Sequence, residues 1–193
     1  AKSHNSTVSH QGSAIAAGGN LVIEAGNDLT LSASDASAGK DAQLSAGRDL
    51  TLDAQQTSNS SGSGKSEKHS TGVDHAAVSA GNNLVLTAGQ DIHSQAASLA
   101  AGEKAGLQAG RDVNLQAEAT TWGNDSRQKR HTVVSDHVRQ QGTEITSGGD
   151  TVIVAGRDVN ATASQVMAQE DIGVQAGRDV NLTTATESDY HYE

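Results

Sequence analysis

The residues most regularly placed for chemistry in this sequence are six aspartates, each two positions after a glycine. The pairs are Gly26 and Asp28, Gly47 and Asp49, Gly89 and Asp91, Gly110 and Asp112, Gly156 and Asp158, and Gly177 and Asp179. If these segments stack as strands at about 4.8 Å, they form a column of carboxylates. Such a column suits a calcium site or the acid pair of a glycosidase.

A structural role explains these aspartates better. An Asp in a glycine-containing corner hydrogen-bonds its own backbone in an Asx-turn. The glycine-rich nonapeptide of calcium-binding β-rolls is absent from the sequence. Arginines next to four of the aspartates offset the stacked charge: Arg48, Arg111, Arg157 and Arg178. We therefore predict structural corners, with no metal, no cofactor and no catalytic residue.

Histidines form a second pattern, because they occur in three pairs with a spacing of six residues. The pairs are His4 and His10, His69 and His75, and His131 and His137. In an extended strand, positions six apart lie on one face about 20 Å from each other, so one segment alone cannot chelate a metal. Solvated strand residues are the simpler interpretation. The alternative is that neighbouring segments stack their histidines into a pH-sensitive or metal-bridged contact.

Composition argues against a globular enzyme and against nucleic acid as a partner. The chain of 193 residues has no Phe, Pro or Cys, 2% aromatic and 34% hydrophobic residues, and a net charge of −10. Phosphate neutralisation needs a basic surface, which this chain lacks. No apolar segment approaches the length of a membrane span, and the N-terminal residues carry no signal-peptide pattern, so we expect any export signal to lie outside this sequence.

The elements that position these residues follow from an internal repeat. An Ala-Gly unit followed by alternating apolar residues occurs twelve times. Its markers are Gly18, Gly26, Gly39, Gly47, Gly81, Gly89, Gly102, Gly110, Gly148, Gly156, Gln169 and Gly177. Spacings of 8 and 13 residues alternate and make coils of 21 residues, while two of the longer gaps are enlarged by 21 and 25 residues. Six coils and two insertions result.

The alternation of apolar and polar residues within a coil predicts three short strands, each with one buried face. We predict an all-β chain, a right-handed parallel β-helix with three sides, and one fragment, 1–193, of a longer rod. Stacking places apolar residues in columns, and Ser94 and Thr151 are polar exceptions. One column contains Ile23, Leu44, Leu86, Leu107, Ile153 and Val174, and a second contains Leu29, Leu50, Ile92, Val113, Val159 and Val180.

The insertions, at about 55–73 and 118–141, are predicted to be hairpins that leave the second strand of a coil and return to the third. They concentrate non-repeating side chains, which specific recognition requires, so we expect them to bind partners. The candidate residues are Lys65, Lys68, His69, His75, Trp122, Arg127, Lys129, Arg130, His131 and His137. The alternative is that the insertions only cover strand edges.

The segments Ala-Gly-Arg-Asp-Val-Asn-Leu at 109–115 and 176–182, and Ala-Gly-Asn-Asp-Leu-Thr-Leu at 25–31, resemble the repeats of filamentous haemagglutinin exoproteins. All six coils share the resemblance. Paired coils with long Ser/Thr-rich insertions are most similar to the second haemagglutinin repeat region of CdiA-type contact-dependent growth inhibition toxins. The missing glycine at Gln169 departs from the pattern at one corner.

The resemblance implies a Gram-negative cell-surface filament, exported through an outer-membrane two-partner transporter, with its toxic or adhesive activity elsewhere in the parent chain. It further implies that the region contacts the outer membrane of a target cell and assists toxin delivery, with flanking coils of the same chain as neighbours. An adhesive module that binds host or neighbouring cells is the alternative. An enzyme is disfavoured, because the aspartates repeat and the sole Trp lies on an insertion.

Overall fold

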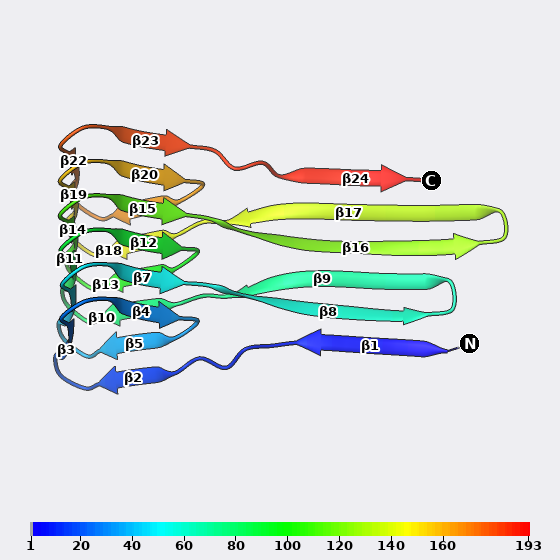
Figure 1. Ribbon diagram of the computed structural model, residues 1–193, viewed down its shortest axis with the longest axis horizontal. Helices are drawn as coiled ribbons and strands as arrows, with labels where there is room; N and C mark the ends of the chain where they lie inside the picture. The colour runs from blue at the N-terminus through cyan, green and yellow to red at the C-terminus, as the bar shows by residue number, and fades with distance from the viewer. Residues whose placement is uncertain (1) are drawn as a thin grey trace.

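The structure, a computed structural model, describes residues 2–193, and all regular secondary structure in that range is β-strand. Three parallel sheets and one antiparallel sheet, each of six strands, make up the molecule. Every coil passes once through each of the parallel sheets in turn, which confirms the predicted three-sided solenoid (Figure 1).

Each side of the solenoid is one parallel sheet. The first side contains β3 (Leu21–Ala25), β6 (Ala42–Ala46), β11 (Leu84–Ala88), β14 (Ala105–Ala109), β19 (Thr151–Ala155) and β22 (Ile172–Ala176). The second side contains β4 (Leu29–Ser32), β7 (Leu50–Asp53), β12 (Ile92–Gln95), β15 (Val113–Gln116), β20 (Val159–Thr162) and β23 (Val180–Thr183). The third side contains β2 (Ala14–Ala17), β5 (Asp35–Ala38), β10 (Ala77–Ala80), β13 (Ser98–Ala101), β18 (Glu144–Ser147) and β21 (Gln165–Ala168).

The strand register confirms the predicted apolar columns. Leu107, for example, pairs with Leu86 on one side and Ile153 on the other, and Val113 pairs with Ile92 and Val159. Alternate residues of each strand point into a dry interior, and Leu107 is only 1% exposed. The interior is therefore one continuous stack that runs through all six coils.

Polar side chains inside this stack are hydrogen-bonded, as buried polar groups must be. The Ser94 hydroxyl lies 2.9 Å from the hydroxyl of Thr143, and Thr143 also donates to the Ser94 carbonyl. Thr151 lies 2.8 Å from the hydroxyl of Ser147. The two exceptions in the sequence pattern are thus satisfied by partners that the sequence analysis did not identify.

The corner between the second and third sides alternates between two forms from coil to coil. In the first, third and fifth coils a left-handed alanine closes it: Ala33 (φ 44°), Ala96 (φ 51°) and Ala163 (φ 45°). In the second and fourth coils the chain leaves at this corner and forms a hairpin, which returns to the third side. The predicted hairpin insertions are confirmed, and their sites are set by this alternation.

The hairpins and the chain ends together form the antiparallel sheet, which we call the insertion sheet. Its strands are β1 (Ser3–Val8), β8 (Gln55–Ser63), β9 (Ser66–Asp74), β16 (Glu118–Gln128), β17 (His131–Gln141) and β24 (Ser188–Tyr192), in that spatial order. None of its residues is fully buried. The sheet is a single layer that projects from the solenoid with both faces in solvent (Figure 1).

Among residues 2–193, no helix has the length and hydropathy required to cross a membrane.

Candidate binding surface on the insertion sheet

The aspartate column at the glycine corners is a structural ladder between coils. In five successive steps, an Asp Oδ1 accepts a hydrogen bond from the backbone N–H of the Asp in the next coil, at 3.1–3.3 Å. The expected Asx-turn within one coil was therefore wrong. Stacking places the next coil's N–H beneath each carboxylate, which makes the bond between coils rather than within one.

Arginines of this column neutralise the carboxylates of the preceding coil. Arg48 bonds Asp28, and Arg111 bonds Asp91, each at 2.6 Å. The hydrogen bond from Arg48 holds the pKa of Asp28 below its usual value, and Arg157 lowers the pKa of Asp112 in the same way. Among residues 2–193, Asp49 has no such partner, because Gln90 stands where four of the other corners carry arginine. The ladder therefore holds successive coils together, and its arginine charges are paired within the molecule.

A second ladder, which was not predicted, lies at the corner between the third side of the solenoid and the first side of the next coil. Backbone N–H groups bond the side chain of the previous coil at Asn20, Asp41, Asn83 and Asp150. Gln169 stands at this corner in place of the usual glycine, and the neighbouring bond from Glu170 N–H to Gly149 is stretched to 3.4 Å. No group of three or more His, Cys, Asp or Glu in residues 2–193 could hold a metal ion.

The strands of the insertion sheet alternate in direction, which decides where the histidines lie. Each returning strand, β1, β9 or β17, is separated from the next by an outgoing strand. The histidine segments are therefore not neighbours, and the hypothesis that they stack their histidines was wrong. Residues paired across strands share a face, so His4 and His69 lie on one face, and His131 and His137 on the other. His75 lies exposed beyond the end of β9.

On the first face, each histidine reaches across a glycine to a carboxylate two strands away. His69 pairs with Gly123, which pairs with Asp136, and His69 Nε2 lies 3.1 Å from Asp136 Oδ1. His4, Gly62 and Glu67 repeat the arrangement with a looser contact of 4.0 Å. A Cβ at Gly123 would meet the His69 ring at 2.6 Å. These glycines therefore leave room for contacts that tie the hairpins together.

The opposite face carries an aromatic and charged cluster built from Trp122, His137, Arg139 and Asp189. The rings of Trp122 and His137 stack with centroids 5.0 Å apart, and the Arg139 guanidinium lies 5.3 Å from the Trp122 centroid. His137 Nδ1 and Arg139 both contact Asp189. The hydrogen bond from His137, followed by that from Arg139, lowers the pKa of Asp189. Trp122 remains 43% exposed, which leaves apolar surface for a partner.

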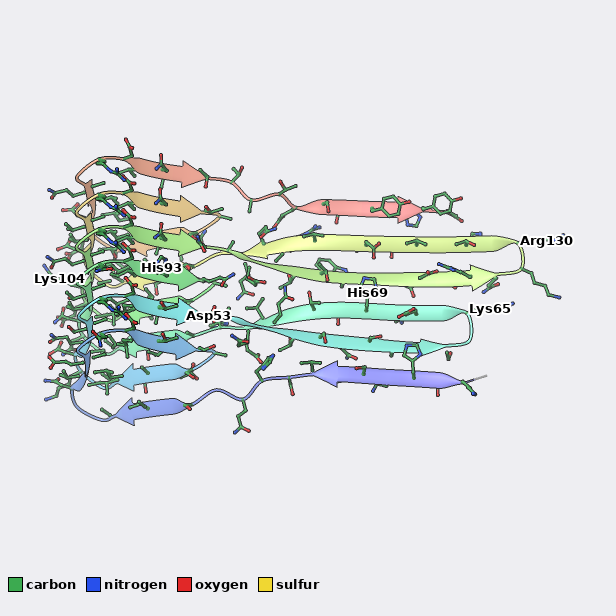
Figure 2. All side chains as sticks on the ribbon, in the orientation of Figure 1. Asp53, Lys65, His69, His93, Lys104 and Arg130 are labelled. Carbon is green, nitrogen blue, oxygen red and sulfur yellow. The ribbon has the colours of Figure 1, made fainter. Side chains whose placement is uncertain are left out.

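The remaining candidate residues gather at the hairpin turns. Figure 2 shows Lys65 and Arg130 at the end of the sheet farthest from the coils. Lys65 lies in the turn between β8 and β9, and Lys129 and Arg130 lie in the turn between β16 and β17. Arg127 forms an ion pair with Asp125 at 2.9 Å. The turns are thus cationic, while the Trp122 cluster lies farther back along the strands.

Register explains which of these residues were missed by the sequence analysis. The Trp122 and His137 pair follows from counting back from the hairpin turn. The contributions of Gly123, Asp136, Arg139 and Asp189 depend on which hairpin lies beside which, and no local pattern indicates that. The hollows beside the hairpin turns, lined in part by Lys65 and by Arg130, are open rather than enclosed.

Comparison with known proteins identifies the repeat. The haemagglutinin repeat family matches residues 1–65, 57–135 and 123–193. Each match covers a returning strand, two coils and an outgoing strand, and the overlaps fall on the hairpins. No solved structure gives a significant match.

Relatives of known sequence are much longer than this chain. A tRNA nuclease CdiA of Escherichia coli is 47% identical over 185 residues, 96% of this chain but 5% of the relative. A deoxyribonuclease CdiA of Dickeya dadantii is 34% identical over 94% of this chain and 6% of the relative. A 16S rRNA endonuclease CdiA of Enterobacter cloacae is 52% identical over 75 residues, 39% of this chain and 2% of the relative.

The nuclease names belong to those long proteins, of which this chain matches only a small repeat segment. The haemagglutinin repeat is itself a structural module. With three copies of that repeat across its length, the chain belongs to the haemagglutinin-repeat family of CdiA-type, secreted cell-surface exoproteins of Gram-negative bacteria.

Proposed function

We propose that this chain is a non-catalytic segment of a longer rod in a contact-dependent growth inhibition exoprotein, and that it contacts the outer membrane of the target cell to assist toxin delivery. The observation that carries the proposal is that the coils and the insertion sheet expose different kinds of side chain. The coils expose mainly repeated short polar residues, with outward-facing valines such as Val85 and Val152, whereas the insertion sheet holds Trp122, its Arg139 partner and the basic turns in solvent.

Apolar side chains of the solenoid interior are exposed at both ends of the stack, which supports the proposal that the chain is a segment of a longer rod. Ile15 at one end is 53% exposed, and Val180 and Leu182 at the other are 48% and 78% exposed. These side chains occupy the same columns as fully buried residues of the central coils. Further coils of the same parent chain would bury them, as neighbours do in other repeat proteins. Export of the parent chain would use an outer-membrane two-partner transporter.

Excision of the hairpins in the full-length parent protein tests the contact role. Removing residues 57–72 and 122–137 leaves Gln56 paired with Val73, and Thr121 with Val138. An Asn-Gly turn closes each pair. We expect the coils to keep their β circular dichroism and cooperative melting, because loop closure costs little, and we expect delivery into target cells to be lost.

A matched control replaces the same residues with Gly-Ser segments of equal length, which keeps chain length but removes the side chains. Full delivery by the excised protein would show that the hairpins only cover edges and that rod length is the function. Loss of attachment to host cells, with growth inhibition unaffected, would favour an adhesin instead.

A further inference from the structure

Four cations lie in the hairpin turns or at the start of β9 and form no ion pair within residues 2–193. They are Lys65, Lys68, Lys129 and Arg130. The acids close to them lie nearer to other side chains: Asp125 forms an ion pair with Arg127, Glu67 lies 4.0 Å from His4, and Glu193 lies 3.5 Å from His131. Within residues 2–193, none of the four cations lies within ion-pair distance of a carboxylate. Their charges are therefore available to an external anion.

Most cations on the coils, in contrast, form ion pairs with aspartates. Arg48, Arg111, Arg157 and Arg178 each bond an aspartate of the preceding coil, and Lys104 bonds Asp150 at 2.9 Å. A cation that bonds a carboxylate at this distance has little charge left for a partner. Within residues 2–193, five of the six coil cations are thus paired with carboxylates and Lys40 is the exception, so unpaired positive charge is concentrated near the hairpin turns.

Charge is also separated along the length of the molecule. The insertion-sheet segments 2–8, 55–74, 118–141 and 188–193 hold seven of the 13 basic and seven of the 23 acidic residues. That leaves six basic and 16 acidic residues, a net charge of −10, on the coil segments. An anionic surface would repel such a body at close range.

The strands of the insertion sheet hold the acidic coils away from whatever the turns contact. Strands of nine and eleven residues span about 30 Å or more, whereas the Debye length in physiological salt is about 8 Å. Repulsion of the coils is therefore screened when the turns touch a surface. Lys65 and Arg130 lie at the same far end of the sheet, where the second hairpin extends farther than the first (Figure 2), so a surface inclined to the strands can meet both turns at once.

Each turn lies beside a shallow open hollow. The first, of about 430 Å³, is lined in part by Lys2, Lys65 and Arg127. The second, of about 310 Å³, lies between Lys129, Arg130 and Tyr192. Tyr192 is 56% exposed, and tyrosine is favoured where an apolar phase meets a polar one.

We propose that the hairpin turns dock on an anionic lipid surface through Lys65, Lys68, Lys129 and Arg130, which bind the phosphate groups of its lipids. This rests on the proposed contact role of the insertions and names the chemistry of the partner. Each lysine or arginine near an anionic membrane strengthens binding by about fivefold. Because the turns repeat along the rod, successive hairpins add to the attachment without any deep pocket.

The test measures sedimentation of the 193-residue chain with phosphatidylcholine vesicles, with and without phosphatidylglycerol, in physiological salt. The turn variant K65Q/K68Q/K129Q/R130Q removes four charges. Its matched control, Q43E/Q108E/Q165E/Q175E, shifts the net charge equally but alters exposed coil residues. Circular dichroism and melting temperature establish that both variants are folded.

We expect the wild-type chain to bind only vesicles that contain phosphatidylglycerol, the turn variant to bind at least about 100-fold more weakly, and the coil variant to bind nearly as well as wild type. Three results would overturn the proposal: no wild-type binding, equal binding by the turn variant, or an equal loss in the coil variant. Competition by inorganic phosphate at constant ionic strength, or tighter binding to duplex DNA, would identify a different partner and also overturn it.

The two proposals fail separately. If hairpin excision abolishes delivery but the chain does not bind anionic vesicles, the proposed contact role stands and the proposed lipid partner is wrong. If the vesicles bind as expected but excision leaves delivery intact, the turns bind lipid without serving delivery.

Discussion

At the scale of single residues, the corner glycines are required by the close approach of successive coils. A Cβ built on Gly110 would lie 2.1 Å from the carbonyl oxygen of Gly89, and Gly47, Gly156 and Gly177 meet the previous corner in the same way. None of these corner glycines has a positive φ. A side chain at such a corner would push the coils apart, so glycine is needed there for successive coils to stack at the strand spacing.

The first prediction is that Gly110→Ala destabilises the chain by about 3 kcal/mol, because the new methyl group separates two coils. Gly106→Ala is the matched control, since Gly106 lies in the same coil and the nearest atom to its Cβ is 4.0 Å away. Urea unfolding of both variants measures the difference. Equal midpoints would show that the coils adjust freely at the corner.

The second prediction concerns the one internal corner without an arginine. Gln90→Arg places a guanidinium where it can bond Asp49, as Arg111 bonds Asp91. We expect a gain of about 0.5–1 kcal/mol, reduced by added salt, in thermal unfolding. Gln90→Glu is the control and should lower stability, because it adds a carboxylate to the aspartate column. A gain for Glu as large as that for Arg would exclude an electrostatic origin.

At the scale of elements, the insertion sheet is held by contacts between strands that lie far apart in the sequence. β9 and β16 join the two hairpins, and β1 and β24 extend the sheet on either side. The sheet has no apolar core, so cross-strand pairs are its unit of stabilisation. Histidine and carboxylate contacts recur between the hairpins and the terminal strands, and the one to Asp189 holds β24 through a carboxylate with a lowered pKa.

The third prediction is that β24 detaches as the pH falls below the usual Asp value of 3.8. His137 and Arg139 hold the pKa of Asp189 below that value. Such a group stabilises the folded state fully above its unfolded pKa, and this stabilisation is lost as the pH falls through the folded pKa. NMR intensities of the Tyr190 and Tyr192 amides should therefore fall in acid before those of the coils.

Asp189→Asn serves as the control for this titration. The variant removes the carboxylate, so β24 should be held more weakly at neutral pH and should show no further loss in this window. Identical acid profiles for wild type and Asp189→Asn would assign the transition to other carboxylates.

At the scale of the whole molecule, stability belongs to the stack of coils. Burial of an apolar side chain contributes about 1.5–3 kcal/mol, while ordering each residue costs about 1.5 kcal/mol. A single coil of 21 residues, with few apolar side chains, therefore cannot fold alone. Neighbouring coils add the backbone ladder and the shared interior, as in other linear repeat proteins.

The fourth prediction is that Leu107→Asp destabilises the whole rod by several kcal/mol, because it places an unpaired carboxylate in a dry stack. Leu107 is 1% exposed between Leu86 and Ile153. Gln108→Asp, at the next and exposed position, is the control and should melt nearly as wild type. Circular dichroism on heating compares them, and similar melting of the two variants would mean that the register of this column is wrong.

The sequence by itself determined the solenoid, its coil length and the register of its columns. Each of these depends on a period: alternation of two along a strand and a repeat of 21 between coils. A register error of one residue would bury polar side chains, so residues such as Leu44 and Leu107 could be placed from the sequence alone. The hairpin origins of the insertions followed from where the repeat was interrupted.

The tertiary structure alone decided what the insertions become. A polar strand with two exposed faces has no buried side to fix its partner, so the sequence did not show that the hairpins and chain ends form one sheet. The alternation of outgoing and returning strands keeps the histidine segments apart and places His69 beside Asp136, and Trp122 against both Arg139 and His137. Such contacts between distant strands exist only once the coils have stacked.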